Sequence, residues 1–186
     1  MITDEQILKA KENLNVLIET QWINEFFLSP IWIFLLALIL FAYALFIYLV
    51  DKKRIIEILL YGSLVAVSFA VYDSIAQHLN YWVTLKGVLP IEPHYFLGNL
   101  TLIPLFAMLV YQYTSSWRRY LIWITVWAGL LVFVYYNLLL SYFNIFVYIK
   151  RFSAIIDFTL FLASGIIARW IIVSLLKLER KRKYNE

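Results

Sequence analysis

The sequence predicts an all-α, polytopic membrane helix bundle with five transmembrane helices and an N-terminal amphipathic helix. Composition is the first reason: 63% of the 186 residues are hydrophobic and only 15% are charged, whereas soluble domains are about half apolar and a quarter charged. The mean hydropathy of +0.78 agrees with this. The second reason is that five long apolar runs follow one another. The third is that Lys and Arg gather in short clusters between these runs, as membrane topology requires.

Residues 1–28 are predicted to form an amphipathic helix that lies along the membrane surface. Thr3 and Gln6 fit a capping box, in which two side chains satisfy free amides at a helix start. Apolar residues from Ile7 to Trp22 recur near helical spacing. The leading residues are net acidic and no small-residue cleavage site follows, so we do not expect a signal peptide.

The first two spans are predicted at residues 31–50 and 55–78. Ser29-Pro30 has the pattern of an N-cap followed by the first helical residue. The 20 uncharged residues that follow are enough to cross a hydrocarbon core. The charged turn at 51–54 ends the first span, and the second continues towards a loop that contains Pro90 and Pro93.

The remaining spans are predicted at residues 96–113, 121–140 and 153–176. Pro104 lies within the third span and is expected to kink it, because proline lacks a backbone donor. A short basic and aromatic turn at 117–120 precedes the fourth span, and a loop at 141–152 precedes the fifth. The chain therefore divides into an interfacial helix at 1–28, a transmembrane domain at 29–176 and a basic cytoplasmic tail at 177–186.

The distribution of Lys and Arg predicts the orientation of the bundle. Five spans place the 51–54 turn, the 117–120 turn and the tail on one side, with ten Lys and Arg residues, against five on the other side. Positive charge marks the cytoplasmic side. We therefore expect a multi-pass protein of the plasma membrane, with its N-terminus outside and its C-terminus in the cytoplasm.

Polar residues near the outer interface are the main candidates for a site. They comprise Asp73, Gln77, His78, Glu92, His94, Asn99 and Asp157. Asp73 and Gln77 are four residues apart and share a helical face. Two His and several carboxylates have the chemistry to bind a cation or relay protons, but no HExxH or similar metal-binding spacing is present. The simpler interpretation is a wet interface with helix ends, and the sequence predicts no metal site and no cofactor.

A second candidate is an ion pair near the inner interface. Glu57 and Arg169 both lie towards the cytoplasmic ends of their spans. They are expected to pair if the second and fifth spans touch; alternatively, the Arg169 side chain extends to the interface.

A central stretch of the chain resembles a known family. Residues 94–123, HYFLGNLTLIPLFAMLVYQYTSSWRRYLIW, combine a Pro-containing helix, a Met-Leu-x-x-Gln-Tyr end and a basic Ser-Trp turn, and Asp73 and Trp82 precede them. Over about residues 30–175 the chain is similar to a family of small five-helix integral membrane proteins of spore-forming bacteria, to which no activity is assigned. The resemblance implies a fold and a location and provides no catalytic residue.

Three functions stay open at this point. The first is an accessory or scaffold subunit that acts through helix contacts with a membrane-protein partner or in a homo-oligomer, with the lipid bilayer as surroundings and no nucleic acid. The second is a small oligomeric transporter or channel. The third is a membrane-embedded enzyme with an outer-face His and carboxylate site. The chain has no cysteine, which excludes thiol chemistry, and it has no nucleophile motif, so its catalytic residues are unknown and an enzyme is the least favoured of the three.

Overall fold

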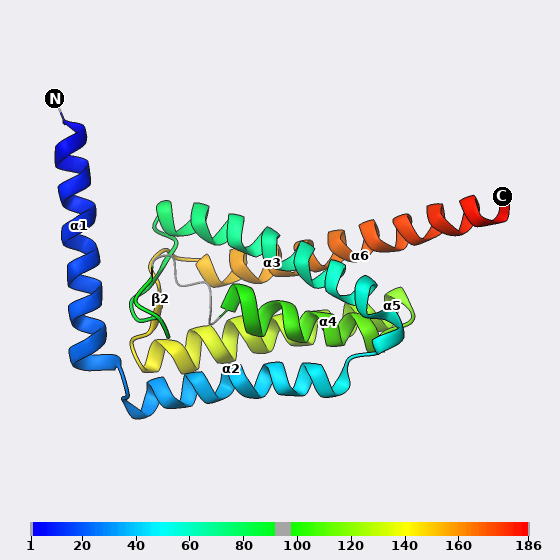
Figure 1. The fold of residues 1–186 in the computed structure, drawn as a ribbon, viewed down its shortest axis with the longest axis horizontal. Coiled ribbons are helices and arrows are strands. Elements are labelled where there is room, and N and C mark those ends of the chain that lie inside the picture. Colours follow the sequence, from blue (N-terminus) through cyan, green and yellow to red (C-terminus); the bar gives the residue numbers. More distant parts are fainter. Residues whose placement is uncertain (1, 92–97, 186) are drawn as a thin grey trace.

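The computed structural model describes residues 2–91 and 98–185 and is almost entirely helical in this part of the chain. The α-helices are α1 (Asp4–Gln21), α2 (Pro30–Leu49), α3 (Ile55–His78), α4 (Ile103–Tyr113), α5 (Trp117–Gly129) and α6 (Ser153–Asn185). Wider helical turns at Trp22–Phe26, Gly98–Leu102 and Leu130–Leu140 extend α1, precede α4 and continue α5. Helices α2 to α6 run side by side, while α1 crosses one end of this bundle (Figure 1).

Within the described residues, four helical segments are long and apolar enough to cross a membrane. They are Pro30–Leu49, Lys52–His78, Trp117–Leu140 and Ser153–Glu179. This finding supports the prediction of an all-α protein with membrane-embedded helices. The fifth expected span differs, because the helical stretch from Gly98 to Tyr113 is shorter than the other four.

Local sequence signals set the limits of α2 and α3. The Ser29 hydroxyl accepts a hydrogen bond from the Trp32 amide at 3.2 Å, directly before Pro30. At the other end Asp51 caps a short turn at Lys52–Arg54 by accepting from the Lys53 amide at 2.9 Å. These devices satisfy amides that a helix start leaves unpaired, so both helices begin close to where the sequence predicts.

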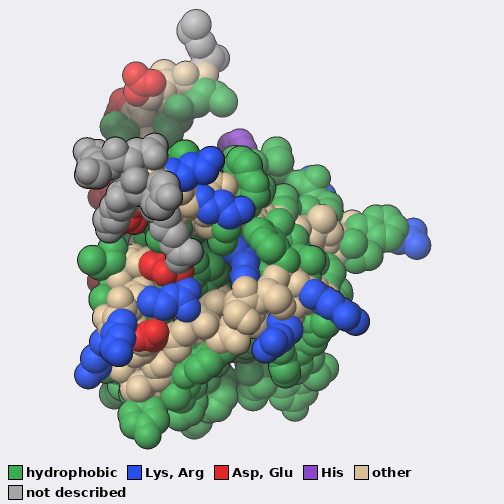
Figure 2. Space-filling view, turned by 90° about the vertical axis from the view of Figure 1, so that its right-hand side faces the viewer, with side chains coloured by type: hydrophobic (Ala, Val, Ile, Leu, Met, Phe, Trp, Pro, Cys, Tyr) green, Lys and Arg blue, Asp and Glu red, His purple; other side chains and the backbone are tan. Residues whose placement is uncertain are grey.

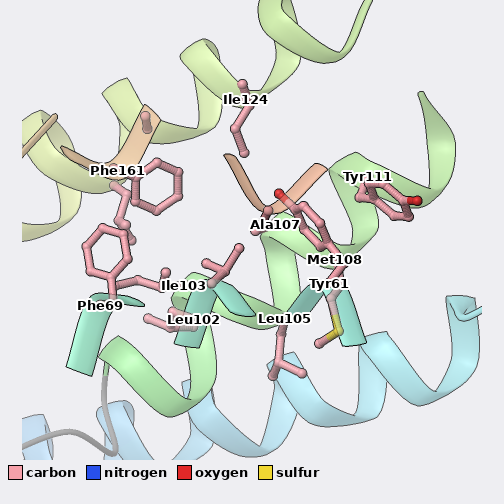
Figure 3. Packing of buried hydrophobic residues seen from close by; sticks show 14 of the residues in the cluster. Tyr61, Phe69, Leu102, Ile103, Leu105, Ala107, Met108, Tyr111, Ile124 and Phe161 are labelled. Carbon is pink, nitrogen blue, oxygen red and sulfur yellow. The ribbon is translucent and has the colours of Figure 1, made fainter. Parts of the chain in front are cut away.

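Helix α4 occupies the centre of the bundle and supplies much of its core. It packs against α2, α3 and α5, and Figure 3 shows Leu105, Ala107, Met108 and Tyr111 among side chains from the surrounding helices. The rings of Tyr61 and Tyr111 stack with centroids 4.4 Å apart. Pro104 lies in the first turn of α4, directly after the wider helical turn at Gly98–Leu102. A change of helix type therefore occurs in the stretch where the sequence predicts a kink.

Two loops pair as a small β-sheet that the sequence did not predict. Strand β1 (Trp82–Thr84) runs antiparallel to β2 (Phe146–Tyr148), with Trp82 opposite Tyr148. The pairing joins segments more than 60 residues apart, so it depends on the packing of the helices that carry them rather than on local pattern.

The two ends of the chain extend away from the bundle. None of the residues of α1 is buried, and its predicted capping box between Thr3 and Gln6 is present. Trp22 attaches the base of α1 to the 85–90 loop, since its indole nitrogen donates to the Gly87 carbonyl at 3.1 Å. Trp32, in α2, contacts the same loop by donating to the Val88 carbonyl at 2.9 Å. At the C-terminus, α6 continues as helix to Asn185, so the described part of the predicted tail extends the last span.

Candidate functional site

The first candidate site is a hydrogen-bonded group of residues at the end of the bundle that carries the β-strands. Asp73, near the end of α3, accepts hydrogen bonds from Gln77 Nε2 at 2.8 Å, Trp82 Nε1 at 2.7 Å and Asn99 Nδ2 at 3.0 Å. Trp82 and Asn99 are 3% and 5% exposed. The carboxylate thus joins α3 to β1 and to the turn before α4.

Asp157 lies in the first turns of α6 and faces the same region. It is buried, and its Oδ2 accepts a hydrogen bond from the Tyr148 hydroxyl at 2.7 Å. Burial and the neighbouring Asp157 carboxylate raise the pKa of Tyr148 well above its usual range. The Tyr148 hydroxyl therefore stays protonated and continues to donate at any physiological pH.

Asp73 and Asp157 line one cavity of about 30 Å³, together with Tyr72, Asn99 and Tyr136. This volume admits about one or two water molecules. The buried Tyr72 hydroxyl has no hydrogen-bond partner among the described residues. A water held by two carboxylates and this hydroxyl has the two to four polar partners that buried waters require, so the site can hold solvent but is far smaller than an organic substrate.

The outer candidates therefore converge only in part. Asp73, Gln77, Asn99 and Asp157 belong to one region, whereas His78 is exposed at the end of α3. Glu92 and His94 lie outside the described residues. Within 2–91 and 98–185, no group of three His, Asp or Glu side chains is placed to hold a metal ion.

The second candidate site surrounds Arg169 at the opposite end of the bundle. This guanidinium is 5% exposed and donates to Thr114 Oγ1 and the Thr114 carbonyl, both at 3.0 Å. Its Cζ lies 4.3 Å from the ring centre of Tyr120 and 5.1 Å from that of Trp117. Such cation–π contacts and carbonyl bonds stabilise a buried cation without a carboxylate.

The predicted ion pair between Glu57 and Arg169 does not form in the described part of the chain. Glu57 instead pairs with Arg54 one turn earlier, at 2.6 Å, and accepts a hydrogen bond from the Tyr111 hydroxyl at 2.6 Å. Arg54 is the nearer partner because residues three apart lie on the same face of a helix.

Two open pockets adjoin this end of the molecule. One of about 750 Å³ lies between the start of α3 and the last turns of α6, and one of about 360 Å³ lies between α6 and the end of α4. They share Arg54, Glu57 and Leu176. Lys and Arg side chains gather on this face of the molecule (Figure 2), and the two pockets are lined by Lys52, Lys53, Arg54 and Lys177.

Sequence reasoning missed several residues that hold these sites together. Tyr148 and Thr114 were not singled out, although each directly contacts a buried charged residue. Gln112 was noted only within the family pattern, yet its side chain accepts from the Asp51 amide at 2.7 Å and donates to the Leu49 carbonyl at 2.8 Å. Trp82 had one signal, since the resemblance paired it with Asp73.

Comparison with protein families, curated sequences and solved structures finds no match for this chain. Functional inference therefore depends on the geometry of the molecule itself. The site around Asp73 and Asp157 is small and hydrogen-bonded, and the end around Arg169 has open pockets with a cationic lining.

Proposed function

We propose that this chain is a five-span, multi-pass protein of the plasma membrane that serves as an accessory or scaffold subunit, with α1 as its contact helix. The observation that carries the proposal is the position of α1. It extends across the end of the bundle with none of its residues buried, while Trp22 at its base donates a hydrogen bond to the 85–90 loop. A helix held in this way presents a surface for a partner.

The side chains of α1 support a protein partner. Ile7, Leu14 and Leu17 recur along one face and are 58%, 53% and 67% exposed. Asp4, Glu5, Glu12 and Glu19 outnumber Lys9 and Lys11. An acidic helix gains nothing from anionic lipid, which attracts basic segments, whereas an apolar helix face fits a groove on another protein.

The stretch from Gly98 to Tyr113 supports the proposed fifth span. At 1.5 Å per residue it extends about 24 Å, somewhat less than the hydrocarbon core. Its central position among the longer helices shields it from lipid, because most residues of α4 are buried. A short central helix of this kind crosses the bilayer without needing a full apolar outer surface.

Photocrosslinking from α1 tests the scaffold role. Leu14 and Glu12 are two residues apart along the chain but about 200° apart around the helix, so they sample opposite faces at similar positions. A photoreactive residue at Leu14 is expected to form a discrete protein adduct in native membranes, and the same residue at Glu12 is expected to form much less. Adducts with lipid alone at both positions would contradict the proposal and make α1 a surface anchor.

A transport role has one observation in its favour, which is that Asp73 and Asp157 line the same cavity. The cavity holds only about one or two waters, and both carboxylates are engaged by hydrogen-bond donors from the protein. Under the scaffold proposal, proton and cation leak in liposomes is expected to be equal for the wild type, Asp73→Asn and Asp157→Asn. If the wild type leaks and either variant does not, the result would favour a transporter.

A further inference from the structure

The groove between the start of α3 and the last turns of α6 combines two kinds of lining. Lys52, Lys53 and Arg54 form its rim and are exposed. Below them the wall is apolar and includes Ile56, Leu60 and Leu175, which are 81%, 45% and 50% exposed. The groove is therefore cationic at one end and apolar along its length.

The adjoining pocket adds to the positive charge. It contributes Arg169 and Lys177, so that five cations face two carboxylates, Glu57 and Glu179, across the two connected spaces. The Arg169 side chain is 5% exposed and its Nε has no hydrogen-bond partner among the described residues. This excess of charge selects an anion, and guanidinium groups bind phosphate oxygens particularly well.

We propose that this groove binds the headgroup of an anionic phospholipid, whose acyl chains lie along the apolar wall formed by α3 and α6. A phospholipid fits this arrangement because its phosphate would contact the cationic rim while the attached acyl chains would contact the apolar wall. A soluble phosphate satisfies the cations only and leaves Ile56, Leu60 and Leu175 without apolar contacts. The groove also lies at a span end, where a lipid headgroup resides in the bilayer.

Lipid binding by the full-length protein in detergent tests the proposal. Native mass spectrometry with phosphatidylglycerol and phosphatidylcholine is expected to show a preference for phosphatidylglycerol. Each basic residue near a charged lipid surface contributes about fivefold in binding. Lys52→Ala/Lys53→Ala should therefore weaken phosphatidylglycerol retention by at least about fivefold, while Lys52→Arg/Lys53→Arg should retain it.

Arg118→Ala/Arg119→Ala is the matched control. These residues are exposed at the start of α5 on the same side of the bundle, and they do not line the groove. The control is expected to bind phosphatidylglycerol like the wild type. Equal loss in both double variants, or no preference between the two lipids, would overturn the proposal and leave only a general attraction of charge. Displacement of phosphatidylglycerol by inorganic phosphate alone would also overturn it, in favour of a soluble anion. Circular dichroism of each variant confirms that the helices are intact.

Discussion

At the scale of single residues, two carboxylates join segments at the end of the bundle that carries the β-strands: Asp73, which is half-buried, and Asp157, which is buried. Asp73 receives donors from α3 itself, from β1 and from the turn that precedes α4, and Asp157 receives one from β2. Both carboxylates therefore depend on segments that meet only in the folded chain. Replacing either carboxylate should therefore lower the stability of the folded protein.

Replacing Asp73 by Ala is expected to destabilise the protein strongly. The indole of Trp82 and the amide of Asn99 are buried, and each buried donor left without a partner costs about 1–3 kcal/mol. We expect a loss of about 2–5 kcal/mol, seen as a lower Tm in detergent. Asp73→Asn keeps an acceptor oxygen and should lose less. Ser68→Ala, an exposed change on the same helix, is the control and should leave Tm nearly unchanged; a fall equal to that of Asp73→Ala would count against the hydrogen-bond account.

Tyr148→Phe is expected to remove stability in a pH-dependent way. The pKa of Tyr148 is raised in the folded protein, so the unfolded chain loses this proton first. The stabilising effect of the protonated hydroxyl is therefore fully present below the unfolded pKa of about 10 and is lost as pH rises towards the folded pKa.

The measurement is the difference in unfolding free energy between wild type and Tyr148→Phe from neutral pH to about pH 11. The difference should be constant up to about pH 10 and shrink above it. A difference that grows with alkaline pH would show that the hydroxyl is not held protonated by Asp157.

At the scale of secondary structure, close packing of helices depends on small residues at particular positions. A Cβ added at Gly165 in α6 would lie 2.9 Å from the hydroxyl of Tyr120 and 3.5 Å from that of Tyr61. These two hydroxyls are hydrogen-bonded to each other at 2.8 Å. An added Cβ at Gly129 meets no atom within 4 Å.

Gly165→Ala and Gly129→Ala are therefore expected to act in opposite directions. Gly165→Ala should lower the stability by about 1–3 kcal/mol because it overpacks the core. Gly129→Ala should raise it by about 0.5–1 kcal/mol because alanine is the better helix former. Thermal unfolding of both variants in the same detergent makes the comparison, and equal shifts would show that α6 does not pack on α5 as described.

The sequence was sufficient to predict helix limits where local signals set them. Ser29-Pro30 and the charged 51–54 turn located α2 almost to the residue, and the i, i+4 spacing of Asp73 and Gln77 correctly placed both on one face. The strands were missed because Trp82 and Tyr148 pair only after the helices pack. The predicted pairing of Glu57 with Arg169 was wrong because Arg54, three residues before Glu57, competes with Arg169 across the bundle.

At the scale of the whole molecule, charge and hydrogen bonding divide the bundle into two unlike ends. The end that carries α1 and the β-strands has a small cavity whose two carboxylates accept hydrogen bonds from the protein. The other end has open pockets with a cationic rim (Figure 2). This asymmetry could be predicted in outline from the clusters of Lys and Arg, but the pockets could not, because they depend on the angle at which α3 and α6 diverge.

In the proposed topology, five helices cross the membrane and leave the two chain ends on opposite sides. The absence of native cysteine makes single-cysteine labelling with a membrane-impermeant maleimide the most direct test. In intact cells, Lys9→Cys and Lys150→Cys should react, whereas Ser115→Cys and Lys181→Cys should react only after permeabilisation. Reaction of Lys9→Cys and Lys181→Cys from the same side would contradict the five-span topology and reduce the number of spans to four.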